Sequence, residues 1–431
     1  MGVFDKIQDI FRIPELKRRI LFTVGLLVVY RFGGHVPTPG VNSDALVAAF
    51  AQSSNTLFGL YDLFVGGSFA KATVFALGIM PYISVSIIFQ LLGAVIPYFE
   101  KLQKEGEEGR KKITQYTRLC TVLLAAAQSL AFARFLESLG AQGVPVVPNP
   151  GLGFQLMTMI TQTTGTILIM WLGEQITERG IGNGISLIIF IGIVARFPSD
   201  LYDTFRALRV GTLSPVVAGL LAILFFLVIA AVVAMTQAQR KIPVQYAKRV
   251  VGRKMYGGQT THIPLRVNTA GVIPIIFAQS LIMLPSTLAL AFQGNAIVQG
   301  LANFVAHGTW AYVLIYGLTI VFFTYFYTAF QFRPDQTADY LRKNGGFIPG
   351  IRPGKPTEEF LSRVTNRITL GGALFLASLA VLPLLVTAAI PGTQGLQLGG
   401  TSVLIVVSVV VETMKQLEAQ MLMRHYEGFI R

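Results

Sequence analysis

The sequence has few charged residues and almost no cysteine. Charged types make up 13% of the 431 residues, whereas hydrophobic types make up 53%. Soluble domains carry roughly a quarter charged residues, so a soluble chain of this length could not cover its surface, and lipid must cover it instead. Cys120 is the only cysteine, which excludes an internal disulfide and a thiolate metal cluster.

Patterns typical of catalysis and metal binding are also missing. The sequence has no phosphate-binding loop that ends in Gly-Lys-Ser/Thr, no zinc-ligand spacing and no nucleophile beside a base. The glycine-rich residues 180–184 lack the strand and helix of a dinucleotide site and predict a tight turn. We therefore expect no enzyme, no cofactor and no metal. The four histidines form no ligand-spaced pair and lie far apart, at His35, His262, His307 and His425.

Long apolar runs dominate the chain and predict an all-α polytopic membrane protein. A spanning helix needs about 20 apolar residues, and ten runs qualify. Residues 1–19 are polar and amphipathic and lack a cleavage site, so they predict an interfacial helix rather than a signal peptide. The ten runs lie roughly at 20–37, 72–98, 115–136, 153–172, 183–200, 213–236, 268–291, 309–331, 368–390 and 400–422.

Lysine and arginine are distributed unevenly between the loops. Cytoplasmic loops of membrane proteins carry an excess of these residues. With the N-terminus inside, the inner segments hold 29 of the 35, so both termini are expected in the cytoplasm. The inner segments are 1–19, 99–118, 173–182, 237–267, 332–367 and the end of the chain from 415.

A short motif occurs at the same place in two spans. Residues 78–81 read Gly-Ile-Met-Pro in the second span, and residues 271–274 read Gly-Val-Ile-Pro in the seventh. The two spans cross the membrane in opposite directions. The repeat therefore predicts two five-helix halves of inverted topology, at 20–205 and 206–431.

One outer segment, residues 57–67, is apolar but too short to span, and glycines interrupt it. Such a piece either lies on the membrane interface or re-enters the membrane inside the protein. The sequence leaves both possibilities open.

The middle of the spans lacks ionisable residues, which ion-coupled transporters keep there to bind ions or relay protons. Isoleucines occupy similar depths instead. They are ordinary packing residues or form an apolar constriction that excludes water and ions. Pairs at i,i+4 share one helix face, as Ile79 does with Ile83 and Ile189 with Ile193. Charged residues lie near the span ends, at Arg134, Glu137, Glu174, Arg196, Glu412 and Lys415.

The two largest inner loops, 237–267 and 332–367, are basic and rich in glycine and proline. The positive charge of these loops keeps them on the cytoplasmic side of the membrane. Loops this long, however, are more often functional than simple connections between helices. Their basic side chains could bind RNA phosphates or an acidic patch on a partner protein.

Seven motifs along the chain, taken in this order, resemble those of SecY, the channel subunit of the bacterial protein-export translocon. The resemblance covers nearly the whole length. The motifs are residues 75–84 (FALGIMPYIS), 105–118 (EGEEGRKKITQYTR), 180–186 (GIGNGIS), 243–249 (PVQYAKR), 270–277 (AGVIPIIF), 344–354 (NGGFIPGIRPG) and 399–402 (GGTS).

The resemblance implies an hourglass pore between the two halves, with a ring of isoleucines at its waist. It implies a plug helix at about 57–71, although Val65, Phe69 and Lys71 depart from commoner plug sequences. It also implies a lateral gate between the second and third spans and the seventh and eighth. The ring residues would be Ile79, Ile83, Ile189, Ile193, Ile276 and Ile405. The plug would include Leu57, Phe58, Leu60, Leu63, Phe64, Gly66 and Gly67, and the gate Ser84, Gln128, Pro81 and Pro274.

The implied function is the passage of unfolded polypeptides across the bacterial plasma membrane and the lateral release of signal sequences and membrane segments into lipid. The implied partners are the SecE and SecG subunits, the SecA ATPase, the ribosome and its RNA, and nascent chains. Two alternatives are a secondary transporter with an inverted repeat and an insertase or scaffold without a pore. The docking residues would be Arg240, Lys248, Arg249, Arg253, Lys254 and Arg352, of which Arg253 and Lys254 match the ribosome-facing tip and Arg352 the arginine needed for work with SecA.

Overall fold

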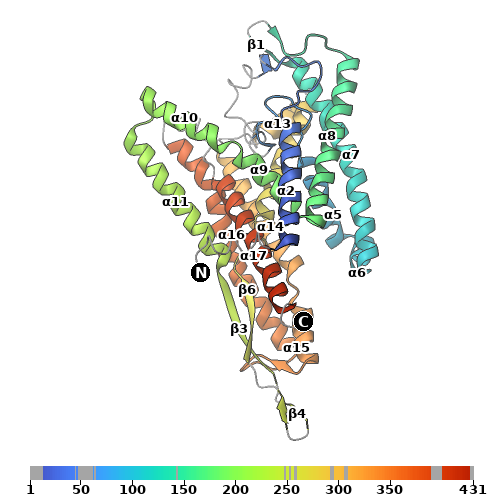
Figure 1. The fold of residues 1–431 in the computed structure, drawn as a ribbon, viewed down its shortest axis with the longest axis vertical. Coiled ribbons are helices and arrows are strands. Elements are labelled where there is room, and N and C mark those ends of the chain that lie inside the picture. Colours follow the sequence, from blue (N-terminus) through green and yellow to red (C-terminus); the bar gives the residue numbers. More distant parts are fainter. Residues whose placement is uncertain are drawn as a thin grey trace.

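The protein, described here from a computed structural model, consists mainly of helices that run alongside one another (Figure 1). The structure describes residues 13–43, 45–46, 62, 65–141, 144–246, 249–251, 254–256, 260–291, 296–304, 309–389 and 400–427. The helices are α2 (Pro14–Gly33), α5 (Met80–Val95), α6 (Pro97–Lys104), α7 (Glu107–Ser138), α8 (Leu152–Arg179), α9 (Gly184–Val194), α10 (Phe197–Val210), α11 (Pro215–Gln237), α12 (Ile273–Ala291), α13 (Ala296–Phe304), α14 (Trp310–Gln331), α15 (Pro334–Lys343), α16 (Lys355–Ala389) and α17 (Gly400–Glu427).

Each of the ten apolar runs overlaps a helix, but fewer helices qualify as spans by length and composition. Within the described residues, six helices are long and apolar enough to cross a membrane, and the bent pair α5 and α6 would make a seventh. The helix of the first apolar run, α2, begins at Pro14, so its first turns carry the charges of residues 15–19. The apolar part of α12 ends at Met283 and is short. The count of ten spans therefore stays a prediction.

The second apolar run differs from its prediction at both ends. We expected one span over 72–98, but the helix begins only at Met80. Turns occupy the residues before it, because Ala72 and Gly78 both have left-handed backbone, with φ of 43° and 56°. At the other end, α5 stops before Pro97 and α6 continues at an angle of 98°. Proline lacks an N–H and clashes with the preceding turn, so it starts a new helix here.

Capping side chains and prolines set several helix starts. Asn183 accepts hydrogen bonds from the backbone N–H groups of Ile185 and Ser186 at the start of α9. Ser214 caps α11 in the same way, and Pro215 follows at the first helical position, where its missing N–H costs nothing. The turn predicted at 180–184 therefore continues directly into α9.

The two basic inner loops pack against each other and form one folded unit. The first contains the long strands β3 (Gln239–Tyr246) and β6 (Thr260–Arg266), which pair antiparallel, and the short strands β4 (Arg249–Val251) and β5 (Lys254–Tyr256). The second contributes β7 (Gly346–Phe347), which pairs with the end of β3. A small apolar core joins this sheet to α15 and the start of α16. A purely α-helical fold class therefore misses this unit, which we call the loop domain (residues 239–246, 260–266 and 334–361).

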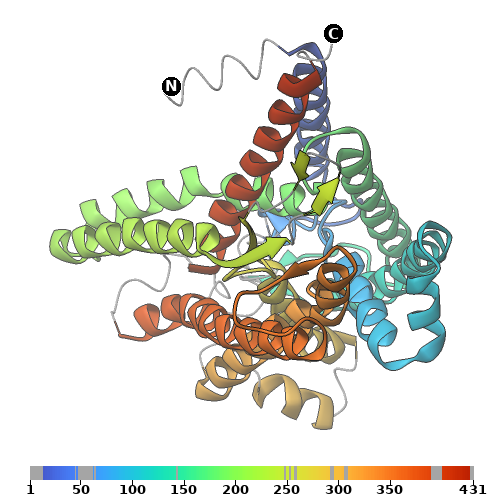
Figure 2. The same ribbon diagram turned by 90° about the horizontal axis from the view of Figure 1, so that it is seen from below.

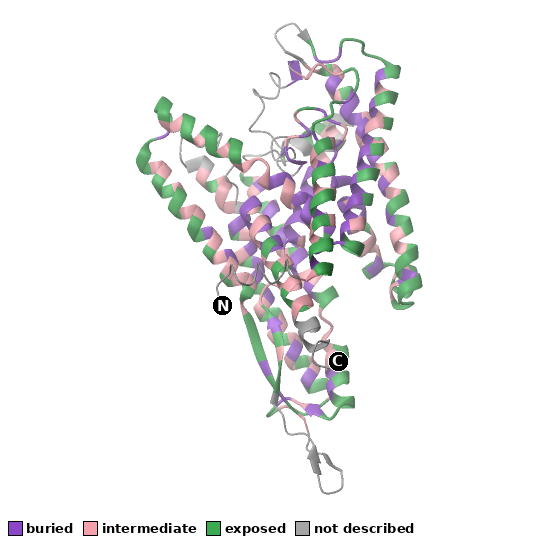
Figure 3. Ribbon diagram, viewed as in Figure 1, coloured by how far each residue is buried: buried purple, intermediate pink, exposed green. Residues whose placement is uncertain are grey.

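Helices α10 and α11 form an arm that extends away from the other helices (Figures 1 and 2). The apolar run predicted at 183–200 covers only the first four residues of α10. The apolar face of α11 is largely uncovered in the chain by itself, with Val216, Ile223 and Phe226 all exposed. In contrast, buried residues gather where the central helices meet (Figure 3). A further hairpin of β1 (Gly140–Ala141) and β2 (Val144–Pro145) lies at the opposite end of the molecule from the loop domain.

Candidate functional site

The six isoleucines predicted to form the ring lie together in one apolar cluster. None is more than 6% exposed. The cluster draws them from both halves of the chain, so residues more than 300 positions apart in sequence meet in space. They are Ile79 and Ile83 at the start of α5, Ile189 and Ile193 on α9, Ile276 on α12 and Ile405 on α17.

The helices that carry these isoleucines also make the contacts between the two halves. Helix α12 packs against α5, and α17 packs against α9. Ile276 is therefore on a helix that faces α5, and Ile405 on a helix that faces α9. The cluster contains aromatic and methionine side chains too, so its packing fits both an ordinary core and a closed apolar constriction. The assignment of a ring stays a prediction.

The helices predicted to border the gate are in direct contact. Helix α12 packs against α7 and α14 as well as α5. Pro81 and Pro274 occupy matching places in the first turns of α5 and α12, and both are buried. Ser84 is buried on α5, whereas Gln128 on α7 is half-buried. In this arrangement the two sides of the predicted gate are packed together.

Sequence reasoning missed two further polar residues on this surface. Gln279 and Ser280 are both buried on α12, which contacts α5, α7 and α14. The signal was available, because two adjacent polar residues interrupt an otherwise apolar run. Their position places polar groups on one of the helices that border the predicted gate.

Only part of the predicted plug falls within the described residues. Gly66 and Gly67 have left-handed backbone, with φ of 70° and 86°, a conformation that glycine adopts at no steric cost. Asp62 is buried, and its backbone carbonyl oxygen accepts a hydrogen bond from the N–H of Gly67 at 2.9 Å. The other predicted plug residues, Leu57, Phe58, Leu60, Leu63 and Phe64, lie outside the part that the structure describes.

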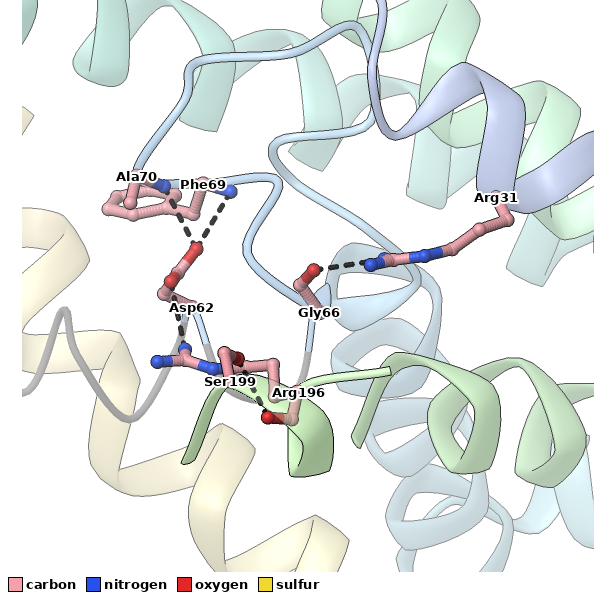
Figure 4. Close-up of polar contacts among 7 residues, drawn as sticks. All are labelled: Arg31, Asp62, Gly66, Phe69, Ala70, Arg196 and Ser199. Carbon is pink, nitrogen blue, oxygen red and sulfur yellow. Dashed lines mark hydrogen bonds and ion pairs between the residues drawn. The ribbon is translucent and has the colours of Figure 1, made fainter. Parts of the chain in front are cut away.

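Asp62 is the centre of a polar network that sequence reasoning did not find (Figure 4). Its Oδ1 accepts hydrogen bonds from the N–H groups of Phe69 at 3.0 Å and Ala70 at 2.9 Å. Its Oδ2 accepts from Nη1 of Arg196 at 2.9 Å, at the start of α10. Burial raises the pKa of the Asp62 carboxyl, and the Ala70 N–H and Arg196 act against that rise. An acidic residue inside an apolar stretch was the available signal, since a buried charge requires a partner.

The predicted docking residues divide into three groups. Arg240 on β3 and Arg352 before α16 are exposed on the loop domain. Arg249 and Lys254 occupy paired strands, β4 and β5, where Arg249 is opposite Tyr256 and Lys254 opposite Val251. Lys248 and Arg253 lie outside the described residues.

A comparison with protein-family models decides the family. The SecY model matches residues 73–414, most of the chain. This chain belongs to the SecY family. Two curated relatives bear the name protein translocase subunit SecY: that of Streptomyces scabiei is 47% identical and covers 98% of both chains, and that of Thermus thermophilus is 45% identical and covers 97% of this chain and 96% of the relative.

Solved structures share the SecY fold with this chain at much lower sequence identity. One, described as a protein conducting channel, is 20% identical with a TM-score of 0.64 and covers 93% of this chain and 91% of that one. Sec61 in the canine ribosome-channel complex is 19% identical with a TM-score of 0.60 and the same coverage. At these identities the likeness establishes the fold. The inverted-repeat transporter considered from the sequence is not favoured.

Proposed function

We propose that this SecY family chain is a protein-conducting channel of the general secretory pathway. It passes unfolded polypeptides across the membrane and releases membrane segments sideways into lipid. The observation that carries the proposal is the convergence of six buried isoleucines from α5, α9, α12 and α17 in one cluster. The curated relatives are translocase subunits, and solved relatives are protein-conducting channels.

The chemistry of the cluster suits a pore that must accept any sequence. A polypeptide presents every type of side chain in turn, so fixed charges in the constriction would bind some segments and repel others. Branched apolar side chains exclude water and ions when they close on one another. They bind no particular side chain, and they can move apart around a passing chain. In this proposal the isoleucine cluster is the closed seal.

The packing of α12 supports a gate between the halves. In the proposed cycle α12 and α14 separate from α5 and α7, which opens a path into lipid. Pro81 and Pro274 lie in the first turns of α5 and α12, and neither removes a hydrogen bond there. Ser84 and Gln128 would face the polar parts of a departing segment.

The loop domain is the proposed docking surface. No nucleotide-binding motif occurs in the sequence, so the driving force must come from a bound partner. The exposed Arg240 and Arg352 fit a surface that meets acidic groups or RNA phosphates. A solved relative in a ribosome-channel complex supports the ribosome as one partner, and we propose SecA, SecE and SecG as the others. With both termini in the cytoplasm, the loop domain faces the cytoplasm of a bacterial cell.

The test is site-specific photocrosslinking of a translocating chain. A photoreactive residue is placed at Ile83, Ile276 or, as the control, Ile223 on the exposed face of α11. A precursor stalled part-way by a folded domain should crosslink to Ile83 and Ile276 in the same preparation and not to Ile223. Crosslinks at neither ring position would contradict a channel between the halves, and crosslinks at Ile223 alone would point to a scaffold or insertase without a pore.

A further inference from the structure

The segments that lead into α5 and α12 contain the same turn. Gly78 and Gly271 both have left-handed backbone, with φ of 56° and 63°. Two residues after each glycine its helix begins, α5 at Met80 and α12 at Ile273. These two helices carry predicted ring residues and border the predicted gate. Whatever holds the two turns in place therefore determines where both helices start.

One residue, four positions before each of these glycines, is hydrogen-bonded to the segment that follows an earlier helix. The N–H of Val74 donates to the carbonyl oxygen of Val36, after α2, at 2.9 Å. The N–H of Val267 donates to the carbonyl oxygen of Ala238, directly after α11, at 3.0 Å. The chain that enters each gate helix is thus tied to the end of another helix by the same kind of bond.

The strand pairing beside these two hydrogen bonds differs only in its length. Pro37 and Thr73 form an isolated antiparallel bridge. Gln239 and Arg266 are the corresponding pair, and the pairing of β3 with β6 continues from them into the loop domain. The contact that is short before α5 is therefore extended before α12.

The carbonyl oxygen of the same residue lies against a glycine inside a long helix. A Cβ on Gly165 of α8 would overlap the carbonyl oxygen of Val74. A Cβ on Gly372 of α16 would lie 2.7 Å from the carbonyl oxygen of Val267. Because both neighbours are backbone atoms, neither can turn aside as a flexible side chain could. We call these two contacts, Val74 on Gly165 and Val267 on Gly372, the backbone seats.

The helix faces around the two seats also correspond. On both helices, buried residues lie three positions before the glycine and one, four and seven positions after it. They are Gln162, Thr166, Ile169 and Leu172 on α8, and Thr369, Ala373, Leu376 and Leu379 on α16. Each seat therefore lies on the buried face of its helix.

We propose that Gly165 and Gly372 are positioning residues for the gate, each fixing the start of one gate helix through its backbone seat. The inference rests on the proposed channel function. Ile79 and Ile276 lie within five residues of the two turns, so a shift of either seat carries a ring isoleucine with it. The cluster excludes water only while its side chains touch, and close-packed side chains leave gaps when one is displaced. Displacing either seat therefore weakens the closed seal.

A simpler role for both glycines is close packing of helices, which small residues generally permit in membranes. The two roles differ in what a methyl group would change. A packing role predicts lower stability with an unchanged seal, whereas a positioning role predicts a leak in the assembled channel. Matched controls exist on the same helices, because a Cβ on Gly153 of α8 or Gly371 of α16 would meet nothing within 4 Å.

The experiment measures resting ion conductance of the complete translocon in planar bilayers, without precursor. We expect Gly165→Ala and Gly372→Ala each to raise the open fraction about tenfold, equivalent to about 1.4 kcal/mol. Both should also export precursors with defective signals in cells. Gly153→Ala and Gly371→Ala should match the wild type, although they bring the same gain in helix propensity.

The turn before α12 supplies a second pair of variants that leaves the seat contact itself unaltered. A Cβ on Gly271 would meet nothing within 4 Å, so Gly271→Ala acts only through its left-handed backbone. Asparagine tolerates that conformation better than alanine does. We expect Gly271→Ala to leak and Gly271→Asn to leak less. This pair and Gly372→Ala decide the matter if Gly165→Ala fails to assemble.

Wild-type conductance in assembled Gly372→Ala and Gly271→Ala, with only a lower melting temperature, would overturn the positioning role. Equal leaks in Gly372→Ala and Gly371→Ala would overturn it too, since only one of these methyl groups meets the backbone. Signal-dependent precursor export by the wild type, measured in proteoliposomes from the same preparation, tests the channel itself. Absence of that export would contradict the proposed function, whereas normal export with no leak in any variant would contradict the backbone seats alone.

Discussion

The backbones of Gly173 on α8 and Gly184 on α9 are in direct contact. A Cβ on Gly184 would lie 1.9 Å from the carbonyl oxygen of Gly173. The Thr177 hydroxyl oxygen also accepts a hydrogen bond from the Gly184 N–H at 2.9 Å. Small residues at such crossings let membrane helices approach closely. This crossing fixes the start of α9, the helix that carries Ile189 and Ile193.

We predict that Gly184→Ala destabilises the protein and displaces α9. The methyl group would overlap the α8 backbone, which cannot move away as a side chain could, and overpacking of this kind costs about 1–3 kcal/mol. The measurement is the melting temperature of the detergent-solubilised complex. Gly219→Ala on α11 is the control, because its Cβ would meet nothing within 4 Å. Equal melting temperatures for both variants would show that the crossing tolerates a methyl group.

A second prediction concerns Ile405, which is fully buried in the isoleucine cluster. Asparagine at this position would place an amide among apolar side chains, and water entering to solvate it would weaken the seal. We expect Ile405→Asn to raise resting ion conductance and to admit precursors with defective signals. Val410→Asn, on an exposed part of the same helix, should change neither. Normal conductance and normal signal selectivity in Ile405→Asn would argue against a ring at this position.

The isoleucine cluster shows what local pattern can predict. Ile79 and Ile83, and Ile189 and Ile193, are one helical turn apart, so their shared faces follow from the helix period alone. Matching depths then place Ile276 near them. The SecY family and the mainly helical fold, both expected from the sequence motifs, are confirmed by the family model and the solved structures. The role of the cluster as a pore ring stays a prediction.

Features that depend on distant partners could not be predicted in the same way. The sequence around Asp62 contains nothing that identifies Arg196 as its partner, because the pairing arises only when α9 and α10 fold over that segment. The contact of Gln245 with Phe347 in the loop domain similarly joins loops about 100 residues apart. The start of α5 at Met80 could not be predicted for another reason. Residues 72–79 are apolar and fit a helix by composition, but Ala72 and Gly78 adopt left-handed backbone.

A third prediction tests docking at Arg352. Its side chain is exposed, and its backbone carbonyl accepts a hydrogen bond from the Thr357 hydroxyl at 2.8 Å. Reversing the side-chain charge should therefore leave the fold intact and repel an acidic partner surface. We expect Arg352→Glu to stop SecA-driven export while complex yield and melting temperature stay normal. Lys343→Glu, also exposed on the loop domain, is the control, and normal export by Arg352→Glu would remove this docking role.

The final prediction tests whether the two basic loops act as one unit. Leu361 on α16 is fully buried against Ile242 and Val244 of β3 and Ile348 of the second loop. Leu361→Ala should cost about 2–5 kcal/mol because it leaves a cavity where both loops meet. We expect faster proteolysis of both loops and weaker binding of the ribosome and SecA together, with the isoleucine cluster unaffected. Leu370→Ala, at an exposed position of the same helix, should leave all of these unchanged. Loss of one partner with full retention of the other would instead show that each loop docks by itself.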